Sequence, residues 1–223
     1  MTTTQVSTTP ARARTDRTAE VPRRTAITER TVSRLGLGLT AGTLAWATSI
    51  FAFGTMADGV QGRVGDLTGL LFQLGVFCLL TIQIRTRATG TSRAARVMLK
   101  VEAVLLGLAS VWSLLHGILP SNLQDATWLA ALDVFWPLSM LGMAVIAVKL
   151  ATAARWRGAA RVWPLIAESW AIVTVPSFVI FGDEVSRWVG GTHLLIGYAV
   201  LGLLLARRPG LAIPREEPAA AAR

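Results

Sequence analysis

Residues 127–150, with the sequence TWLAALDVFWPLSMLGMAVIAVKL, decide the fold class of this chain. About 20 apolar residues are enough for an α-helix to cross the hydrocarbon core of a bilayer. The stretch contains one acid, Asp133, four residues before Pro137. Because proline has no N–H, the Asp133 carbonyl loses its helical hydrogen-bond partner. The stretch therefore predicts a transmembrane helix kinked at a carboxylate, and an acid inside a span is a candidate functional group.

The rest of the chain has the same apolar character. Of its 223 residues, 52% are hydrophobic and only 16% are charged, whereas soluble domains average about 25% charged residues. The mean hydropathy is +0.52. Six apolar runs are long enough to span a bilayer, at residues 35–56, 64–84, 98–119, 127–150, 162–181 and 188–206. We therefore expect an all-α bundle of six transmembrane helices over residues 34–206, between the tails 1–33 and 207–223.

Lys and Arg are distributed unequally between the two sides of the predicted bundle. Twenty of the 22 lie in the tails or next to the connections after the second and fourth runs. Only Arg63 and Arg187 lie on the other side. Since segments rich in Lys and Arg stay in the cytoplasm, both termini are predicted to be cytoplasmic, in a bacterial-type plasma (inner) membrane. This asymmetry accounts for the net charge of +9, so we expect no nucleic-acid binding. The tail 1–33 lacks hydrophobic periodicity and is predicted to be disordered.

Two histidines and two carboxylates fall near the predicted outer ends of four different runs: Asp66, His116, Asp133 and His193. Trp112 lies one helical turn from His116, and Trp136 lies close to Asp133 in depth, so aromatic side chains are expected at the same level. Such groups favour a divalent metal site, an acid–base set, or a haem between the histidines. Interfacial anchoring and interhelical hydrogen bonding are the structural alternatives. These six residues are therefore candidates for a ligand or proton site, and they identify neither a metal nor a cofactor.

Two glutamates, Glu102 and Glu168, lie toward the predicted cytoplasmic ends of their runs, with Lys149 at a similar depth. An ion pair between a glutamate and a Lys or Arg of another helix is the simpler interpretation. A polar path along the third run is the alternative. Glu102 and His116 are fourteen residues apart, so they share a helix face, and Ser113 lies between them in depth.

Small and aromatic residues indicate how the helices pack and where they meet the membrane surface. Gly38 and Gly42 form a G-x-x-x-G pair in the first run, which permits close helix contact in a homo-oligomer or against another helix of the same chain. The single cysteine, Cys78, excludes a disulfide within the chain. Four tryptophans near the ends of runs predict an interfacial aromatic belt, namely Trp128, Trp156, Trp163 and Trp188.

No motif in the sequence identifies a reaction. Gly-x-Ser-x-Gly, His-Glu-x-x-His and phosphate-binding glycine loops are all missing from it. We therefore predict a non-enzymatic, transporter-like or accessory protein that lies in the lipid bilayer and binds a small or lipidic ligand within the bundle. The alternative is a membrane-embedded enzyme that uses the outer carboxylates and histidines for acid–base chemistry on an apolar substrate. Convergence of these groups on one apolar cavity would favour a binding or catalytic site over separate anchors.

Overall fold

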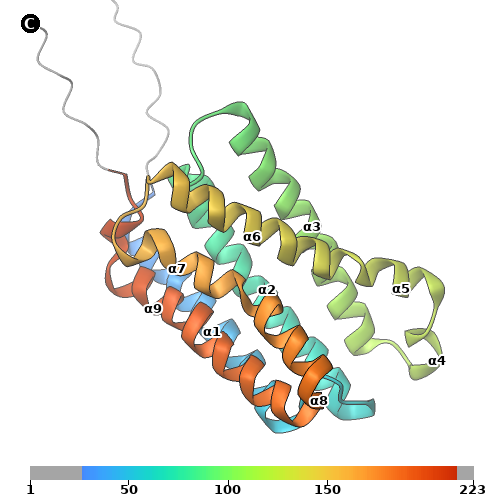
Figure 1. The fold of residues 1–223 in the computed structure, drawn as a ribbon. Helices are drawn as coiled ribbons and strands as arrows, with labels where there is room; N and C mark the ends of the chain where they lie inside the picture. Colours follow the sequence, from blue (N-terminus) through green and yellow to red (C-terminus); the bar gives the residue numbers. More distant parts are fainter. Residues whose placement is uncertain (1–26, 215–223) are drawn as a thin grey trace, which may run out of the picture.

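The computed structural model describes residues 27–214, which form a bundle of α-helices (Figure 1). The helices in chain order are α1 (Glu29–Phe53), α2 (Gly59–Thr86), α3 (Arg93–Ile118), α4 (Ser121–Gln124), α5 (Thr127–Asp133), α6 (Phe135–Ala153), α7 (Ala159–Glu168), α8 (Trp170–Leu194) and α9 (Val200–Arg207). A π-helical segment, Leu195–Ala199, joins α8 to α9, and a 3₁₀ turn, Pro209–Leu211, follows α9. Within residues 27–214 there is no β-strand, so the predicted all-α class is confirmed.

Five helical stretches are long and apolar enough to cross a membrane, and the last of them, Ala159–Arg207, has 49 residues. This stretch reverses at Gly182, whose φ of 78° and ψ of −177° are not helical. Glycine tolerates a positive φ because it has no Cβ. A hydrogen bond joins the two segments on either side of the reversal, because the Trp170 Nε1 donates to the Gly190 carbonyl at 2.9 Å. The described chain therefore has five to six helices apolar enough to span a membrane, which confirms a multi-pass membrane protein.

The helix break predicted at Asp133 is present. α5 ends at Asp133 and α6 begins at Phe135, which leaves the interruption at Val134. Pro137 lies in the first turn of α6, where backbone N–H groups have no helical partner and proline is tolerated. The break lets α5 diverge from the bundle axis toward α4 (Figure 1). This divergence positions one wall of the cavity described below.

Close glycine contacts join α1 to α2 inside the chain. A Cβ added at Gly42 would clash with the Leu71 carbonyl oxygen of α2, and one added at Gly38 would lie 3.0 Å from the Cys78 Sγ. Such close approach matters in membranes, because helix association there depends on van der Waals packing. The predicted G-x-x-x-G pair therefore packs within the chain, and a homo-oligomer stays a prediction that needs other residues.

The predicted boundary of the N-terminal tail is wrong by a few residues. The disordered tail is predicted to reach Ser33, whereas α1 begins at Glu29. Thr28 provides the reason, since its side chain accepts a hydrogen bond from the Thr31 N–H at 3.2 Å and caps the helix. Residues 1–26 and 215–223 lie outside the described part of the chain, so disorder there stays a prediction.

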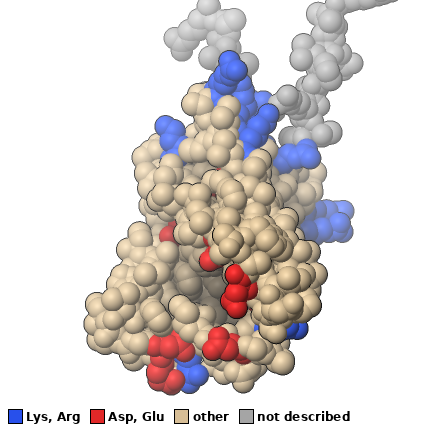
Figure 2. All heavy atoms as spheres, turned by 90° about the vertical axis from the view of Figure 1, so that its right-hand side faces the viewer, with Lys and Arg blue, Asp and Glu red and all other residues tan. Residues whose placement is uncertain are grey.

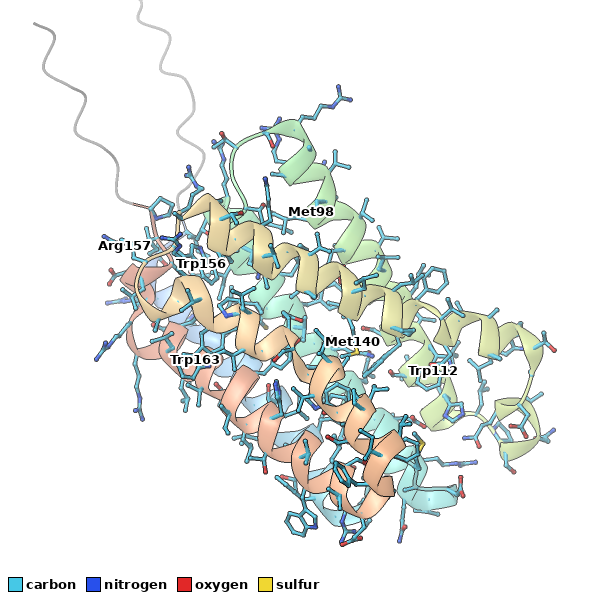
Figure 3. All side chains as sticks on the ribbon, viewed as in Figure 1. Met98, Trp112, Met140, Trp156, Arg157 and Trp163 are labelled. Carbon is cyan, nitrogen blue, oxygen red and sulfur yellow. The ribbon has the colours of Figure 1, made fainter. Side chains whose placement is uncertain are left out.

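The tryptophans predicted to form a belt differ in their environments. Trp156 is fully buried, and its Nε1 donates to the Thr86 Oγ1 at 2.9 Å, so the belt prediction is wrong for this residue. It packs under the end of the bundle where the termini leave, because the connection between α6 and α7 folds back over the helices (Figure 3). Trp163 donates to the backbone of the π-helical segment. Trp128 and Trp188 are 51% and 53% exposed, and their interfacial role stays a prediction.

Charged side chains separate to opposite ends of the bundle. Figure 2 shows Lys and Arg gathered at the end where the termini leave, and Asp and Glu gathered at the other end. We call the first the basic end, where Arg85 and Arg87 lie at the end of α2 and Arg155 and Arg157 connect α6 to α7. We call the second the acidic end, where Asp58 precedes α2, Asp125 lies between α4 and α5, and Asp183 and Glu184 follow the reversal at Gly182.

Candidate functional site

A cavity of about 570 Å³ lies at the acidic end of the bundle, where Figure 2 shows the surface hollowed. Small-molecule sites typically have volumes of roughly 300–1,000 Å³. Its lining comes from α1, the turn at residues 54–58, α2, α3, the junction of α5 and α6, and α8. Thr55 holds the turn against α8, because its Oγ1 donates to the Asp183 Oδ1 at 3.0 Å. We call this space the acidic-end cavity.

Three of the four predicted outer residues meet in the acidic-end cavity: Asp66 of α2, His116 of α3 and Asp133 at the end of α5. The His116 Nδ1 lies 2.7 Å from the Asp66 Oδ2, so these two groups are hydrogen-bonded. Their side chains keep 31% and 16% exposure, respectively. Neither of the two ion pairs within residues 27–214 involves Asp133. The cavity therefore holds one oriented histidine and two carboxylates, Asp58 and Asp133, that form no ion pair within the described residues.

Tryptophan side chains form the deep wall of the cavity. Trp46, Trp136 and Trp170 pack on one another, with ring centroids 5.3–6.0 Å apart, and we call them the tryptophan cluster. Nearer the acidic end, Trp112 stacks on His116 with centroids 4.9 Å apart and planes 18° from parallel. All four tryptophans line the cavity. The predicted aromatic side chains Trp112 and Trp136 therefore do lie beside the predicted polar groups.

The fourth predicted outer residue, His193, does not line this cavity. Its Nε2 lies 3.0 Å from the Ser169 Oγ, at the junction of α7 and α8. Eleven residues separate His193 from the reversal at Gly182, which is about 16 Å along a helix. The apolar run begins at Trp188, but the helix extends back to the reversal, so His193 lies deeper than predicted. The two histidines are therefore not brought together to hold a haem.

The two predicted inner glutamates lie in the core of the bundle. Glu102 and Glu168 are 1% and 6% exposed. The Ser139 Oγ donates to the Glu102 Oε1 at 2.6 Å, and the Tyr198 hydroxyl donates to the Glu168 Oε2 at 2.5 Å. The predicted ion pair with Lys149 is not formed, since the described residues have ion pairs only at the acidic end. Lys149 is exposed near the end of α6, where a long side chain can reach water or headgroups.

A second, small cavity of about 30 Å³ lies on the inner side of the tryptophan cluster. A space of this size can hold one or two water molecules. The residues that line the small cavity include Gln73, Trp136, Ser139, Met140, Glu168 and Tyr198. Figure 3 shows Met140 midway along the bundle, between Trp112 and the end that carries Trp156. Gln73 donates to the Ser113 Oγ at 3.0 Å, and Ser113 lines the acidic-end cavity. Gln73 of α2 thus links the small cavity to the acidic-end cavity. Among the described residues, no hydrogen bond joins Glu102 to Ser113 or His116, so the polar path along α3 stays a prediction.

Sequence reasoning missed several residues of the two cavities, notably Trp46, Trp170 and Tyr198. A signal for them existed in the sequence. Tryptophan and tyrosine in spans concentrate at the membrane interfaces, whereas these three lie well inside their apolar runs. An aromatic residue with a polar atom at that depth needs an internal hydrogen-bond partner. Trp170 and Tyr198 have such partners in the Gly190 carbonyl and Glu168.

Metal binding has no support in the described part of the chain, where no three His, Cys, Asp or Glu side chains are placed to share an ion. Comparisons with known proteins add no functional assignment. No known protein family matches this sequence, and neither a curated protein nor a solved structure is similar to it. The helices identify the chain as a multi-pass membrane protein, and its function has to be inferred from the two cavities.

Proposed function

We propose that this protein binds an organic cation with an apolar body in the acidic-end cavity, as a transporter-like or accessory protein of a bacterial-type plasma membrane. The observation that supports this most strongly is the composition of the lining. Four tryptophans and three aspartates line the cavity, while none of its described lining residues is Lys or Arg. A cavity with this lining attracts positive charge and repels anions.

The charge of the cavity is negative whichever form His116 takes. A protonated His116 would neutralise Asp66, to which it is bonded at 2.7 Å. Asp58 and Asp133 would still line the cavity as carboxylates. Clefts with low-dielectric walls and charges of one sign concentrate the field and raise the local concentration of opposite ions. We therefore expect Asp133, at the break between α5 and α6, to meet the positive centre of the ligand.

The aromatic wall explains why the cation should be organic. A cation within about 6 Å of a tryptophan ring face gains roughly 0.5–2 kcal/mol, more when water is excluded. The tryptophan cluster lines the same cavity as the carboxylates, and Ile50, Val175 and Phe178 add apolar surface to the lining. A hydrated inorganic ion would gain little from these contacts, whereas a substituted ammonium or phosphonium ion would make both cation–π and apolar contacts.

A pair of probes of equal shape and opposite charge tests this proposal. In equilibrium dialysis of the purified full-length protein in detergent, tetraphenylphosphonium should bind saturably and quench tryptophan fluorescence. In a separate dialysis, tetraphenylborate, which has the same shape and a negative charge, should not bind. Equal binding of both probes would mean that only apolar contact matters, and absence of tetraphenylphosphonium binding would contradict the proposal.

The separation of charge between the two ends supports the proposed orientation. Positively charged loops stay in the cytoplasm, so we propose that the basic end and both termini face the cytoplasm and the cavity faces the outside. Cysteine introduced at Ser121 should react with a membrane-impermeant maleimide in intact cells, whereas cysteine at Thr91 should react only after permeabilisation. Both positions are exposed, and Cys78 is replaced by alanine in both variants. Labelling in the opposite order would invert the topology.

The hydrogen bond between His116 and Asp66 favours a second candidate function, acid–base catalysis. A carboxylate bonded to Nδ1 orients the imidazole and leaves Nε2 as the proton-transferring atom. An enzyme of this kind would convert its ligand, so a 4-nitrophenyl ester with a trimethylammonium group serves as the probe. Hydrolysis that is lost in His116→Gln would favour the enzyme. Binding of this ester without His116-dependent hydrolysis would favour the non-enzymatic proposal.

A further inference from the structure

Two carboxylates in the centre of the bundle have no cationic partner among the described residues. Glu102 and Glu168 come from α3 and α7, and each accepts one hydrogen bond, from Ser139 and Tyr198 respectively. The other oxygen of each, Glu102 Oε2 and Glu168 Oε1, is buried and has no hydrogen-bond partner. Gly142 of α6 packs directly against the Glu102 Oε2. Both glutamates therefore have unused acceptor capacity in an apolar, water-poor environment.

The titratable and charged groups of the packed helices do not compensate this pair. Tyr198 of the π-helical segment bonds Glu168, and His193 of α8 bonds Ser169 instead of either glutamate. Arg161 of α7 donates to the Ala151 carbonyl at 2.7 Å. The remaining Lys residues of α3 and α6, Lys100 and Lys149, are exposed. Within residues 27–214, no ion pair reaches either glutamate.

An ionised carboxylate without a cation at this depth costs several kcal/mol, so the pair must take up positive charge. Glu168 and Ser139, which bonds Glu102, line the same cavity of about 30 Å³, and this cavity accepts no large ion. Within residues 27–214, no three metal-ligating side chains are placed together. We propose that Glu102 and Glu168 form a proton-binding site, and that it releases a proton when an organic cation enters the acidic-end cavity. The second half of this proposal rests on the proposed function.

The connection between the two sites is short and passes through interrupted helices. Ser139, which bonds Glu102, lies three residues after Trp136 on α6, and Glu168 lies two residues before Trp170. Trp136 lines both cavities, and Trp170 packs on it and lines the acidic-end cavity. Helix interruptions at Val134 and Ser169 flank this wall, and the π-helical segment presents Tyr198. Interrupted helices at membrane depth mark ligand and ion sites in transporters, and π-helical turns are frequent at functional sites.

The direction of the exchange follows from electrostatics. A cation behind the tryptophan cluster stabilises an ionised glutamate more than a neutral one, because little water lies between them to screen the charges. Cation binding therefore favours loss of the proton. By thermodynamic reciprocity, raising the proton concentration must weaken cation binding by the same coupling free energy. The protein would then release a proton when it binds an organic cation, and release the cation when it binds a proton.

Infrared spectroscopy of the full-length protein tests the proton site without any ligand. The wild-type protein should show a protonated-carboxyl absorption that shifts in heavy water and declines as pH is raised. Glu102→Gln/Glu168→Gln should lack this band, whereas the control Glu184→Gln, at an exposed ion pair, should keep it. Tyr198→Phe keeps both glutamates and removes one hydrogen bond to Glu168, so it should shift the band without abolishing it. This shift assigns the band to Glu168 even if the double glutamine variant does not fold. A wild-type protein without the band, or a double variant that keeps it, would overturn the site.

Proton release on ligand binding tests the exchange. Adding tetraphenylphosphonium to weakly buffered wild-type protein should release protons, detected with a pH dye. Glu102→Gln/Glu168→Gln should bind the probe and release none. Protein that binds the probe without releasing protons, or equal release from the double variant, would overturn the exchange. If the wild type binds no probe, the exchange falls together with the proposed function, whereas the infrared result still decides the proton site.

Discussion

Asp133→Asn should lower the affinity of the protein for tetraphenylphosphonium by at least about tenfold, which corresponds to about 1.4 kcal/mol. The substitution keeps the shape of the side chain and removes its charge. Asp66 shares its charge with His116 through a 2.7 Å hydrogen bond, whereas Asp133 has no ion pair within the described chain. Asp133 is therefore more available to a ligand than Asp66 is, and it lies three residues from Trp136 of the tryptophan cluster, whereas Asp58 lies in the turn at residues 54–58. Equilibrium dialysis measures the affinity, and thermal unfolding in detergent shows that the variant is folded.

A matched variant separates the local charge from the general charge of the acidic end. Asp125 is exposed in the connection between α4 and α5 and does not line the cavity. Asp125→Asn removes the same charge from the same end, so it should change the affinity less than twofold. Equal affinities for wild type, Asp133→Asn and Asp125→Asn would remove Asp133 from the ligand site. Equal losses in both variants would show that the acidic end attracts the cation only at long range.

Gly42→Ala should lower the free energy of unfolding by about 2–3 kcal/mol, the upper range for an overpacked interior. The added Cβ would clash with the Leu71 carbonyl oxygen of α2. Backbone cannot swing aside as a flexible side chain can, so α1 and α2 must separate. Unfolding in mixed micelles of mild detergent and dodecyl sulfate, followed by tryptophan fluorescence, measures the difference.

Gly107→Ala provides the matched control on α3. A Cβ at Gly107 would meet only the Phe77 ring, at an ordinary contact distance of 4.0 Å. Alanine also favours the helix over glycine by about 1 kcal/mol, so this variant should be as stable as the wild type or slightly more stable. Similar stability of Gly42→Ala and the wild type would show that α1 and α2 do not pack as closely as the structure has them.

Several features followed from the sequence because they depend on local covalent chemistry. The apolar runs predict membrane-spanning helices, since every backbone polar group in a bilayer must be bonded within the segment or barrel. Proline removes one N–H at a known place, so the interruption beside Asp133 was predictable from Pro137 alone. The separation of the charged residues between the two ends of the bundle could also be predicted, because Lys and Arg stand next to the apolar runs in the sequence. The predicted tail was a few residues too long, because the Thr28 cap precedes the apolar run.

The site itself was decided by tertiary structure. Which residues of different helices meet depends on how each helix is rotated, and one residue of register turns a side chain by about 100°. Asp66 and His116 meet through such rotation, while Glu102 faces Ser139 and Glu168 faces Tyr198 instead of a lysine. Depth along a helix also depends on where the chain reverses, which is why the Gly182 reversal leaves His193 away from the cavity. The sequence by itself thus determined the helices and their charges, and packing alone determined which polar groups face one another.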